Sequence, residues 1–223
     1  MRGARPRAGP ALRRAAAPRA GRVWAGACQI WAGARVGLLG GSFNPAHAGH
    51  RHLSLEALRR LRLDSVWWLV SPQNPLKPVA GMGSMDERLA AARRVARHPR
   101  LAVTDIEARL GTRYTVDTMA ALIARFPRTR FVWLMGADGL AELPRWDRWP
   151  QLFRLVPIAI FDRPSYSQKA LCGSAASRFA RYRVAERHAG QLADHRPPAW
   201  VFFHSRLHGA SATAIRERRE TGA

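Results

Sequence analysis

Two histidines, His47 and His50, lie three positions apart, shortly after the glycine pair Gly40 and Gly41. The apolar run 36–39 before the glycines is typical of a buried strand, and apolar residues recur at helical spacing between positions 53 and 61. Glycines let a ligand approach the backbone closely or let φ become positive. A strand, a glycine turn and a helix start together expose backbone N–H groups and the positive end of a helix dipole, which bind phosphate. Because residues three apart in a helix share a face, the spacing predicts that both imidazoles contact a polyphosphate.

A metal ion is the alternative ligand for this histidine pair. Structural zinc takes four protein ligands and catalytic zinc takes three, and the sequence places no third ligand near the pair. A glycine turn before a helix also occurs as a simple tight connection. The phosphate interpretation therefore depends on the whole string 36–52 rather than on any one part of it.

The elements that must position these histidines follow from the alternation of strand and helix patterns. Strands are predicted at 36–39, 65–70, 101–106, 130–135, 156–161 and 200–204, and helices at 46–61, 85–97, 116–126 and 211–219. Ser84 and Glu87 form the pattern of a capping box before the second helix. The stretch 165–199 shows no clear pattern. Strands separated by helices predict an α/β domain with a doubly wound parallel sheet and with ligands at the carboxyl ends of the strands.

The charge of the chain first suggests a nucleic-acid binder. The 223 residues, enough for one domain, carry a formal net charge of +22. Only Lys77 and Lys169 among the 37 basic residues are lysines, so 35 are arginines. This skew, together with the abundant alanine, favours a coding bias spread over the surface rather than a selected basic patch. The charge attracts anionic substrates and, without specificity, RNA, so the sequence predicts no specific nucleic-acid partner.

Residues 1–34 form a separate compositional zone. They contain seven arginines, no acidic residue and many Ala, Gly and Pro, which predicts a disordered basic extension. The basic part is too long for a signal peptide and Gln29 interrupts the apolar part that follows. Cys28 and Cys172 show no framework spacing, and no apolar run reaches the roughly 18 residues of a membrane helix. These features predict a cytoplasmic protein without a membrane partner.

Two motifs resemble those of the nucleotidylyltransferase superfamily. The string from Gly41 to His50, Gly-Ser-Phe-Asn-Pro-Ala-His-Ala-Gly-His, is similar to its Gly-x-Phe-Asp/Asn-Pro-x-His-x-Gly-His signature. The resemblance implies a single Rossmann-like domain over residues 35–220, in which the two histidines contact nucleotide phosphates. It also implies a nucleotide-binding loop of Gly40, Gly41, Ser42 and Phe43.

The second motif is Ser211-Ala-Thr-Ala-Ile-Arg216, which alone would be an ordinary helix cap. It resembles the Ser-Ser/Thr-Thr-x-Ile-Arg motif near the C-terminus of the superfamily, whose hydroxyls, amides and arginine hold the phosphates of ATP. Ala212 departs from the motif, where a second hydroxyl is usual. Ser211, Thr213 and Arg216 are therefore the predicted phosphate contacts.

Four further pieces resemble one family of this superfamily, the bacterial nicotinate-nucleotide adenylyltransferases. They are Ser71-Pro-Gln-Asn-Pro-Leu-Lys77, Tyr114-Thr115 with Asp117-Thr118, Gly136-Ala-Asp138 followed by Leu143-Pro-Arg-Trp146, and Arg163-Pro164. The resemblance covers about residues 35–217. It implies that the indole of Trp146 stacks on a pyridine ring, that backbone groups near Tyr114 and Thr115 bind its carboxylate, and that Asp138 holds ribose or adenosine hydroxyls. It also places Arg163 among the substrate contacts.

The activity implied by this resemblance is transfer of AMP from ATP to nicotinate mononucleotide in pyridine nucleotide (NAD) biosynthesis. The catalytic set would be His47, His50, Lys77 and Arg216, which neutralise charge on the transferring phosphate. Mg²⁺ would be carried by the ATP phosphates, with no protein metal site. The alternatives are a sister enzyme acting on phosphopantetheine, glycerol phosphate or nicotinamide mononucleotide, and an inactive Arg-rich RNA-binding relative. The sequence leaves open the choice between nicotinate and nicotinamide, and between a monomer and a homo-oligomer.

Overall fold

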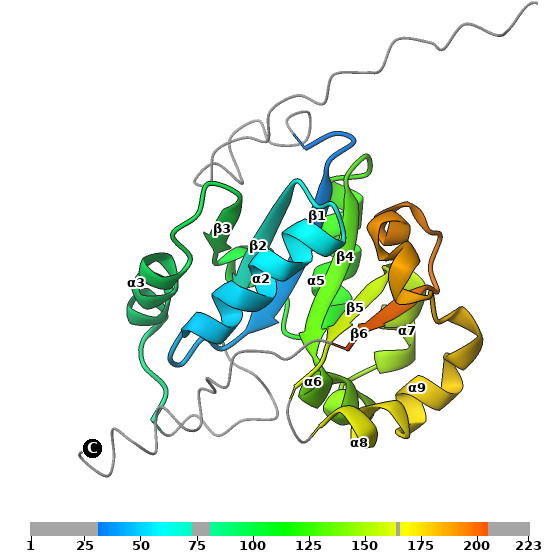
Figure 1. The fold of residues 1–223 in the computed structure, drawn as a ribbon. Coiled ribbons are helices and arrows are strands. Elements are labelled where there is room, and N and C mark those ends of the chain that lie inside the picture. The colour runs from blue at the N-terminus through cyan, green and yellow to red at the C-terminus, as the bar shows by residue number, and fades with distance from the viewer. Residues whose placement is uncertain (1–30, 73–80, 164–165, 205–223) are drawn as a thin grey trace, which may run out of the picture.

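The computed structural model describes residues 31–72, 81–163 and 166–204 (Figure 1). Six strands form one fully parallel sheet in the order β3-β2-β1-β4-β5-β6. Their bounds are β1 Arg35–Gly41, β2 Ser65–Val70, β3 Leu101–Thr104, β4 Arg130–Gly136, β5 Ile158–Phe161 and β6 Trp200–Phe203. This is the strand order of a doubly wound sheet, so the predicted α/β fold with a parallel sheet is confirmed.

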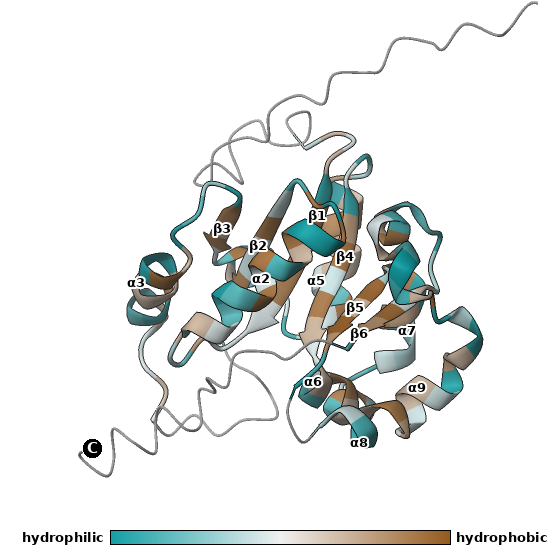
Figure 2. Cartoon of the chain, viewed as in Figure 1, coloured by the Kyte–Doolittle hydropathy of each residue, from teal (hydrophilic) through white to brown (hydrophobic). Residues whose placement is uncertain are grey.

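Helices cover both faces of the sheet. One face carries α2 (Ala48–Arg60), α3 (Met85–Val95) and the 3-10 helix η3 (Glu186–Asp194). The opposite face carries α4 (Ile106–Leu110), α5 (Thr115–Arg125), α6 (Ala137–Glu142), α7 (Trp149–Leu155), α8 (Ser167–Leu171) and α9 (Ser174–Arg178), with the short η1 (Leu143–Arg145) and η2 (Ala180–Tyr182). The strands are largely apolar, whereas the helices are polar on the sides that face away from the sheet (Figure 2). Two apolar layers therefore enclose the sheet.

The boundaries of several elements differ from the prediction. The strand expected at 101–106 ends at Thr104, and Ile106 begins α4, which the sequence pattern did not predict. This single helical turn ends at Gly111, whose φ of 64° is the left-handed conformation that closes many helices. The strand expected at 156–161 begins at Ile158, since Pro157 has no N–H to donate to a neighbouring strand. The capping box of Ser84 and Glu87 is confirmed, with both reciprocal hydrogen bonds present.

The boundary of the predicted basic extension is wrong at its C-terminal end. Trp31 is 2% exposed and packs edge-on against Trp67 of β2, with ring centroids 5.1 Å apart. Its carbonyl accepts a hydrogen bond of 2.8 Å from the hydroxyl of Thr129, and the Gly33 N–H donates to the carbonyl of Arg128 at 2.7 Å. Residues 31–34 therefore belong to the folded body, while residues 1–30 lie outside the described part.

Trp31→Ala is expected to lower the free energy of unfolding by about 3 kcal/mol, because it leaves a cavity beside Trp67. A truncated chain that begins at Arg35 should lose at least as much. Urea unfolding followed by circular dichroism measures both changes. Tyr166→Ala is the matched control, since this aromatic ring is 41% exposed and its loss should change stability by less than about 0.5 kcal/mol. Equal effects of the two substitutions would show that Trp31 does not belong to the core.

Candidate active site

The candidate site lies at the carboxyl edge of the sheet, where β1 and β4 end side by side. β1 ends at Gly41 and β4 at Gly136, and the two strands pair in parallel. The chain leaves β1 toward α2 on one face and leaves β4 toward α6 on the other. A doubly wound sheet binds ligands in the crevice at this change of direction.

Gly40 and Gly41 lie within β1, and neither has a positive φ. A Cβ on Gly40 would stand 2.5 Å from the indole of Trp133, so packing within the protein requires glycine at this position. In the loop that follows β1, the left-handed region is occupied by Phe43, with φ of 49°. Its ring is buried and stacks on Trp68 at 5.0 Å, so Phe43 is part of the packing beneath the site.

His47 and His50 cap α2 reciprocally. The Gly49 N–H donates to Nδ1 of His47 at 3.1 Å, and the His47 N–H donates to Nδ1 of His50 at 3.2 Å. The rings lie 3.8 Å apart, which confirms that both are on one face, and His50 also packs on Phe43 at 4.8 Å. Because both Nδ1 atoms accept hydrogen bonds, the proton of each neutral imidazole is on Nε2. The first turn of α2 contains no acidic residue, so no carboxylate within that turn offsets the positive end of the helix dipole.

Arg88 of α3 joins the loops that surround this helix start. Its guanidinium donates to the carbonyls of Ser42 at 2.9 Å, Ser71 at 2.7 Å, Pro72 at 3.1 Å and Gly83 at 3.0 Å. The side chain is buried, and burial lowers the pKa of the guanidinium from its usual value, although arginine remains charged in proteins. Sequence analysis did not single out Arg88, because arginine is too frequent in this chain for one more to stand out.

A second buried polar group, Glu107 of α4, links the loop after β2 to α5. Its carboxyl accepts hydrogen bonds from the hydroxyls of Ser71 at 2.6 Å and Thr118 at 3.4 Å. The Thr118 hydroxyl also lies 2.8 Å from the hydroxyl of Thr112 and 3.3 Å from the carbonyl of Tyr114. Within the described ranges, no cation forms an ion pair with Glu107. Arg88 and Glu107 together connect the histidine side of the site to the Tyr114 side.

Arg148 brings together the two segments predicted to bind the substrate base. It donates to Asp117 of α5 at 2.7 Å, and its guanidinium lies 5.8 Å from the ring centroid of Tyr114. Hydrogen bonds to Asp117 and Asp147 raise the pKa of this guanidinium. Trp146 is half-buried and packs edge-on against Trp133 at 6.3 Å. The indole of Trp146 and the start of α5 at Tyr114 and Thr115 therefore lie on segments held together by Arg148.

Asp138 and Arg163, predicted for different parts of the ligand, form an ion pair. Asp138 lies in the first turn of α6 after β4, and Arg163 follows β5, so the pair spans two adjacent strand ends. A Cβ on Gly136 would stand 2.4 Å from the Asp138 carboxylate, which explains the glycine there. Each side chain is 30% exposed, so the pair remains accessible.

Four predicted site residues lie outside the described part of the chain: Lys77, Ser211, Thr213 and Arg216. In the described ranges no three His, Cys, Asp or Glu side chains are grouped so as to hold a metal ion. Those same ranges contain no helix long and apolar enough to cross a membrane.

The buried carboxyl of Glu107 predicts a pH-dependent stability. Burial raises its pKa from the usual 4.5, and the hydrogen bonds from Ser71 and Thr118 offset only part of this effect. The folded chain therefore holds this proton more tightly than the unfolded chain. The resulting stabilisation is present below pH 4.5 and is lost as the pH rises through the higher folded-state pKa.

Glu107→Gln removes this titration and keeps both hydrogen bonds, since the amide accepts from Ser71 and donates to Thr118. The stability of Glu107→Gln relative to the unmodified chain should therefore increase as the pH rises from about 4 to 8. Urea unfolding at several pH values measures this difference. The exposed Glu142→Gln is the control and should show no such trend. A flat difference for Glu107→Gln would contradict the role given to its burial.

The fold defines the class of protein: a Rossmann-like α/β protein with a histidine pair beside the point where its sheet changes winding direction. The chain belongs to the cytidylyltransferase-like family, whose family model matches residues 38–218. It is 58% identical over 181 residues to a Cereibacter sphaeroides protein named probable nicotinate-nucleotide adenylyltransferase, covering 81% of this chain and 96% of that protein. A Parvibaculum lavamentivorans protein of the same name is 56% identical over 186 residues, covering 83% and 92%.

The fold is also similar to that of a solved structure. The Plasmodium falciparum nicotinic acid mononucleotide adenylyltransferase complexed with NaAD matches with a TM-score of 0.62 and 13% identity. The match covers 82% of this chain and 83% of the other. At this identity the similarity supports the fold.

Proposed function

We propose that this chain is a nicotinate-nucleotide adenylyltransferase, which transfers AMP from ATP to nicotinate mononucleotide and releases deamido-NAD and pyrophosphate. The reciprocal cap of His47 and His50 at the start of α2 carries the proposal, because it holds the two imidazole rings 3.8 Å apart on one face, directly after the carboxyl end of β1. The names of the relatives at 56–58% identity support the same activity.

The reaction needs positioning and charge neutralisation more than covalent chemistry by the protein. A phosphate oxygen of nicotinate mononucleotide attacks the α-phosphorus of ATP in line. The bond from that phosphorus to the bridging oxygen breaks, and pyrophosphate leaves with the electron pair. Because the attacking phosphate is already ionised at neutral pH, no general base is required, and the rate depends on alignment and on stabilising negative charge.

In this proposal, His47 and His50 donate through Nε2–H to the phosphates beside the amide groups of the α2 N-terminus. Lys77, Arg216, Ser211 and Thr213 complete the phosphate contacts from outside the described residues. Mg²⁺ enters with the ATP phosphates, in keeping with its preference for phosphate and water oxygens over an all-protein cage. Gly40, Gly41 and Ser42 form the floor of the nucleotide site, with Phe43 packed beneath them.

The pyridine base occupies the side of the site held together by Arg148. The exposed part of the Trp146 indole stacks on the ring, and backbone groups at Tyr114 and Thr115 bind its carboxylate. Asp138, oriented by its ion pair with Arg163, holds ribose or adenosine hydroxyls. The lone cysteines Cys28 and Cys172 fit a reducing compartment, so the proposal places the reaction in the cytoplasm.

Trp146→Ala is expected to raise the KM for nicotinate mononucleotide by about tenfold, because a stacked aromatic pair contributes about 0.5–1.5 kcal/mol beyond its buried area. Trp146→Phe should recover most of this loss. The KM for ATP should change little, since the proposal places the adenosine elsewhere. An equal rise in both KM values would instead indicate a packing role against Trp133.

Pyrophosphate release from ATP and Mg²⁺ tests the activity directly. Nicotinate mononucleotide, nicotinamide mononucleotide and phosphopantetheine are supplied in turn to the full chain. Release with nicotinate mononucleotide alone is expected, because a site that binds a carboxylate discriminates against an amide that mispairs. Release only with phosphopantetheine would support the sister activity. The absence of any release, with steeply salt-dependent RNA binding, would support the RNA-binding alternative.

A further inference from the structure

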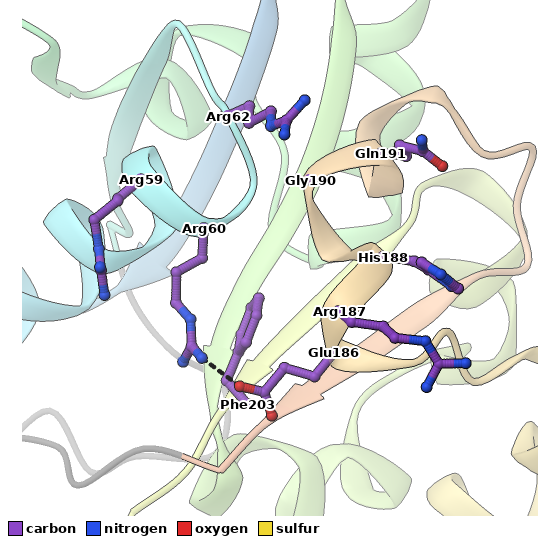
Figure 3. A pocket seen from close by; sticks show the side chains of 9 residues that line it. All are labelled: Arg59, Arg60, Arg62, Glu186, Arg187, His188, Gly190, Gln191 and Phe203. Carbon is purple, nitrogen blue, oxygen red and sulfur yellow. Dashed lines mark hydrogen bonds and ion pairs between the residues drawn. The ribbon is translucent and has the colours of Figure 1, made fainter.

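A polar cavity lies on the α2 face of the sheet, between the last turn of α2 and η3 (Figure 3). It encloses about 430 Å³ and is lined by arginines from both elements. Arg60 lies ten residues after His50 on α2, which corresponds to about 15 Å along a helix. The cavity is therefore separate from the candidate active site at the other end of this helix.

The charge of this cavity is strongly unbalanced. Four guanidinium groups line it, from Arg59, Arg60, Arg62 and Arg187, against the single carboxylate of Glu186. Glu186 pairs with Arg60, and Arg59 pairs with Glu56 of its own helix. As far as the structure describes the chain, Arg62 and Arg187 take part in no ion pair, and both are exposed. These two guanidinium groups come from different elements, Arg62 from the chain directly after α2 and Arg187 from η3 (Figure 3).

Arg62 lies in the wall of the cavity directly after the C-cap Leu61, in the left-handed conformation that ends α2, and the Leu63 N–H donates to the carbonyl of Leu58 at 3.1 Å. The Arg62 φ of 52° lies in the left-handed region, which glycine adopts without strain and other residues adopt at a cost. The Arg62 stem lies against Gly190 of η3, where an added Cβ would stand 3.0 Å from the arginine Nε and 3.2 Å from Cδ. The stem of Arg62 and the backbone of η3 therefore lie close together in the wall of the cavity.

We propose that this cavity is a binding site for a short polyphosphate chain. Arginine binds phosphate oxygens through pairs of parallel N–H donors and is the side chain best suited to this recognition. Guanidinium groups on two facing elements can contact successive phosphates of one chain, and Gln191 adds an amide donor. A cavity of this size lies within the range of small-molecule sites. The ligand is an inorganic polyphosphate or the phosphate chain of a nucleotide. The proposal does not depend on the adenylyl transfer proposed above.

Calorimetric titration with inorganic tripolyphosphate at about 150 mM salt tests this site. The full chain is used, and it carries His47→Ala and His50→Ala so that the candidate active site contributes little to the measured binding. Adding Arg62→Gly and Arg187→Ala is expected to weaken binding at least tenfold. The matched control is Arg93→Ala with Arg97→Ala, which removes the same charge from exposed positions, one in α3 and one just after it. Because glycine adopts the backbone conformation of residue 62 without strain, Arg62→Gly should keep or raise the Tm, so weaker binding cannot be attributed to unfolding.

The outcomes separate the proposal from general charge attraction. Loss of tripolyphosphate binding that is confined to the Arg62 and Arg187 variant supports the site. A second titration with ATP then shows whether the inorganic chain or the nucleotide binds more tightly. Equal loss in the Arg93 and Arg97 control would overturn the proposal, as would the absence of binding. Tighter binding of an RNA oligonucleotide, reduced equally by both pairs of substitutions, would assign the arginines to a non-specific nucleic-acid surface instead. Pyrophosphate release by the Arg62→Gly, Arg187→Ala chain with intact histidines should remain unchanged.

Discussion

Replacing both histidines of the cap, His47→Ala together with His50→Ala, is expected to lower kcat/KM for pyrophosphate release by at least about 10³-fold. One N–H donor aimed at developing negative charge is worth about 10²–10³ in rate, and donors that act on the same phosphates are not additive. Both Nδ1 atoms are engaged by the backbone of the helix start, which fixes the rings and leaves the proton on Nε2. The loss should appear mainly in kcat, since the charge develops in the transition state.

The cap complicates this experiment, because His47 also stabilises α2. Removing a cap side chain costs about 0.5–2 kcal/mol. His47→Asn separates the two roles: asparagine caps a helix well, but its amide cannot place a donor where the imidazole Nε2 lies. This variant should unfold like the unmodified chain and still lose most of its activity. His195→Ala, at an exposed histidine after η3, should change neither property. Full activity in His47→Asn would assign the histidine a structural role only.

The sheet could be predicted because each strand is buried on both faces. Such strands are continuous apolar runs, and residues 65–70 are buried at every position. The ends of the strands are harder to predict from the sequence. β3 lies at the edge of the sheet, and the chain after Thr104 forms α4, whose Ile106 packs into the apolar layer on one face of the sheet. Trp31 falls within the predicted extension because residues 1–34 share a composition rich in Arg, Ala, Gly and Pro. Its contact with Trp67 is a tertiary interaction that no local pattern records.

The candidate site could be predicted where backbone geometry follows from local sequence, and less well where distant segments meet. The shared face of His47 and His50 follows from helical periodicity alone. The sequence predicts that Gly40 admits a ligand or a positive φ. In the structure, Gly40 instead makes room for the indole of Trp133, which comes from β4. Glu107 and Arg88 were missed, since a charged residue on a helix usually faces solvent. Their burial depends on carbonyls and hydroxyls that other loops supply.

A second large effect is expected for Arg88→Met, which should lower the free energy of unfolding by about 3–5 kcal/mol. Hydrogen bonds to a charged group contribute about 1.5–3 kcal/mol each, and a buried acceptor left unpaired costs about 1–3 kcal/mol. Arg88 donates to four carbonyls from two loops, and methionine cannot replace these hydrogen bonds although it fills much of the same space. Arg88→Lys should recover only part of the loss, because an ammonium cannot match the planar fork of donors.

The same substitution should impair the proposed reaction even where the protein stays folded. The carbonyls of Ser42 and Ser71 belong to the loops that follow β1 and β2, so without Arg88 these loops lose their common anchor beside the histidine pair. A misplacement of about 1 Å can cost about 10²-fold in rate, and pyrophosphate release measured far below the unfolding midpoint should fall by about this factor. Arg94→Met, at an exposed position of the same helix, is the control and should change stability by less than about 0.5 kcal/mol. If the two variants unfold alike, the four hydrogen bonds do not stabilise the site, and the link between the two loops must lie elsewhere.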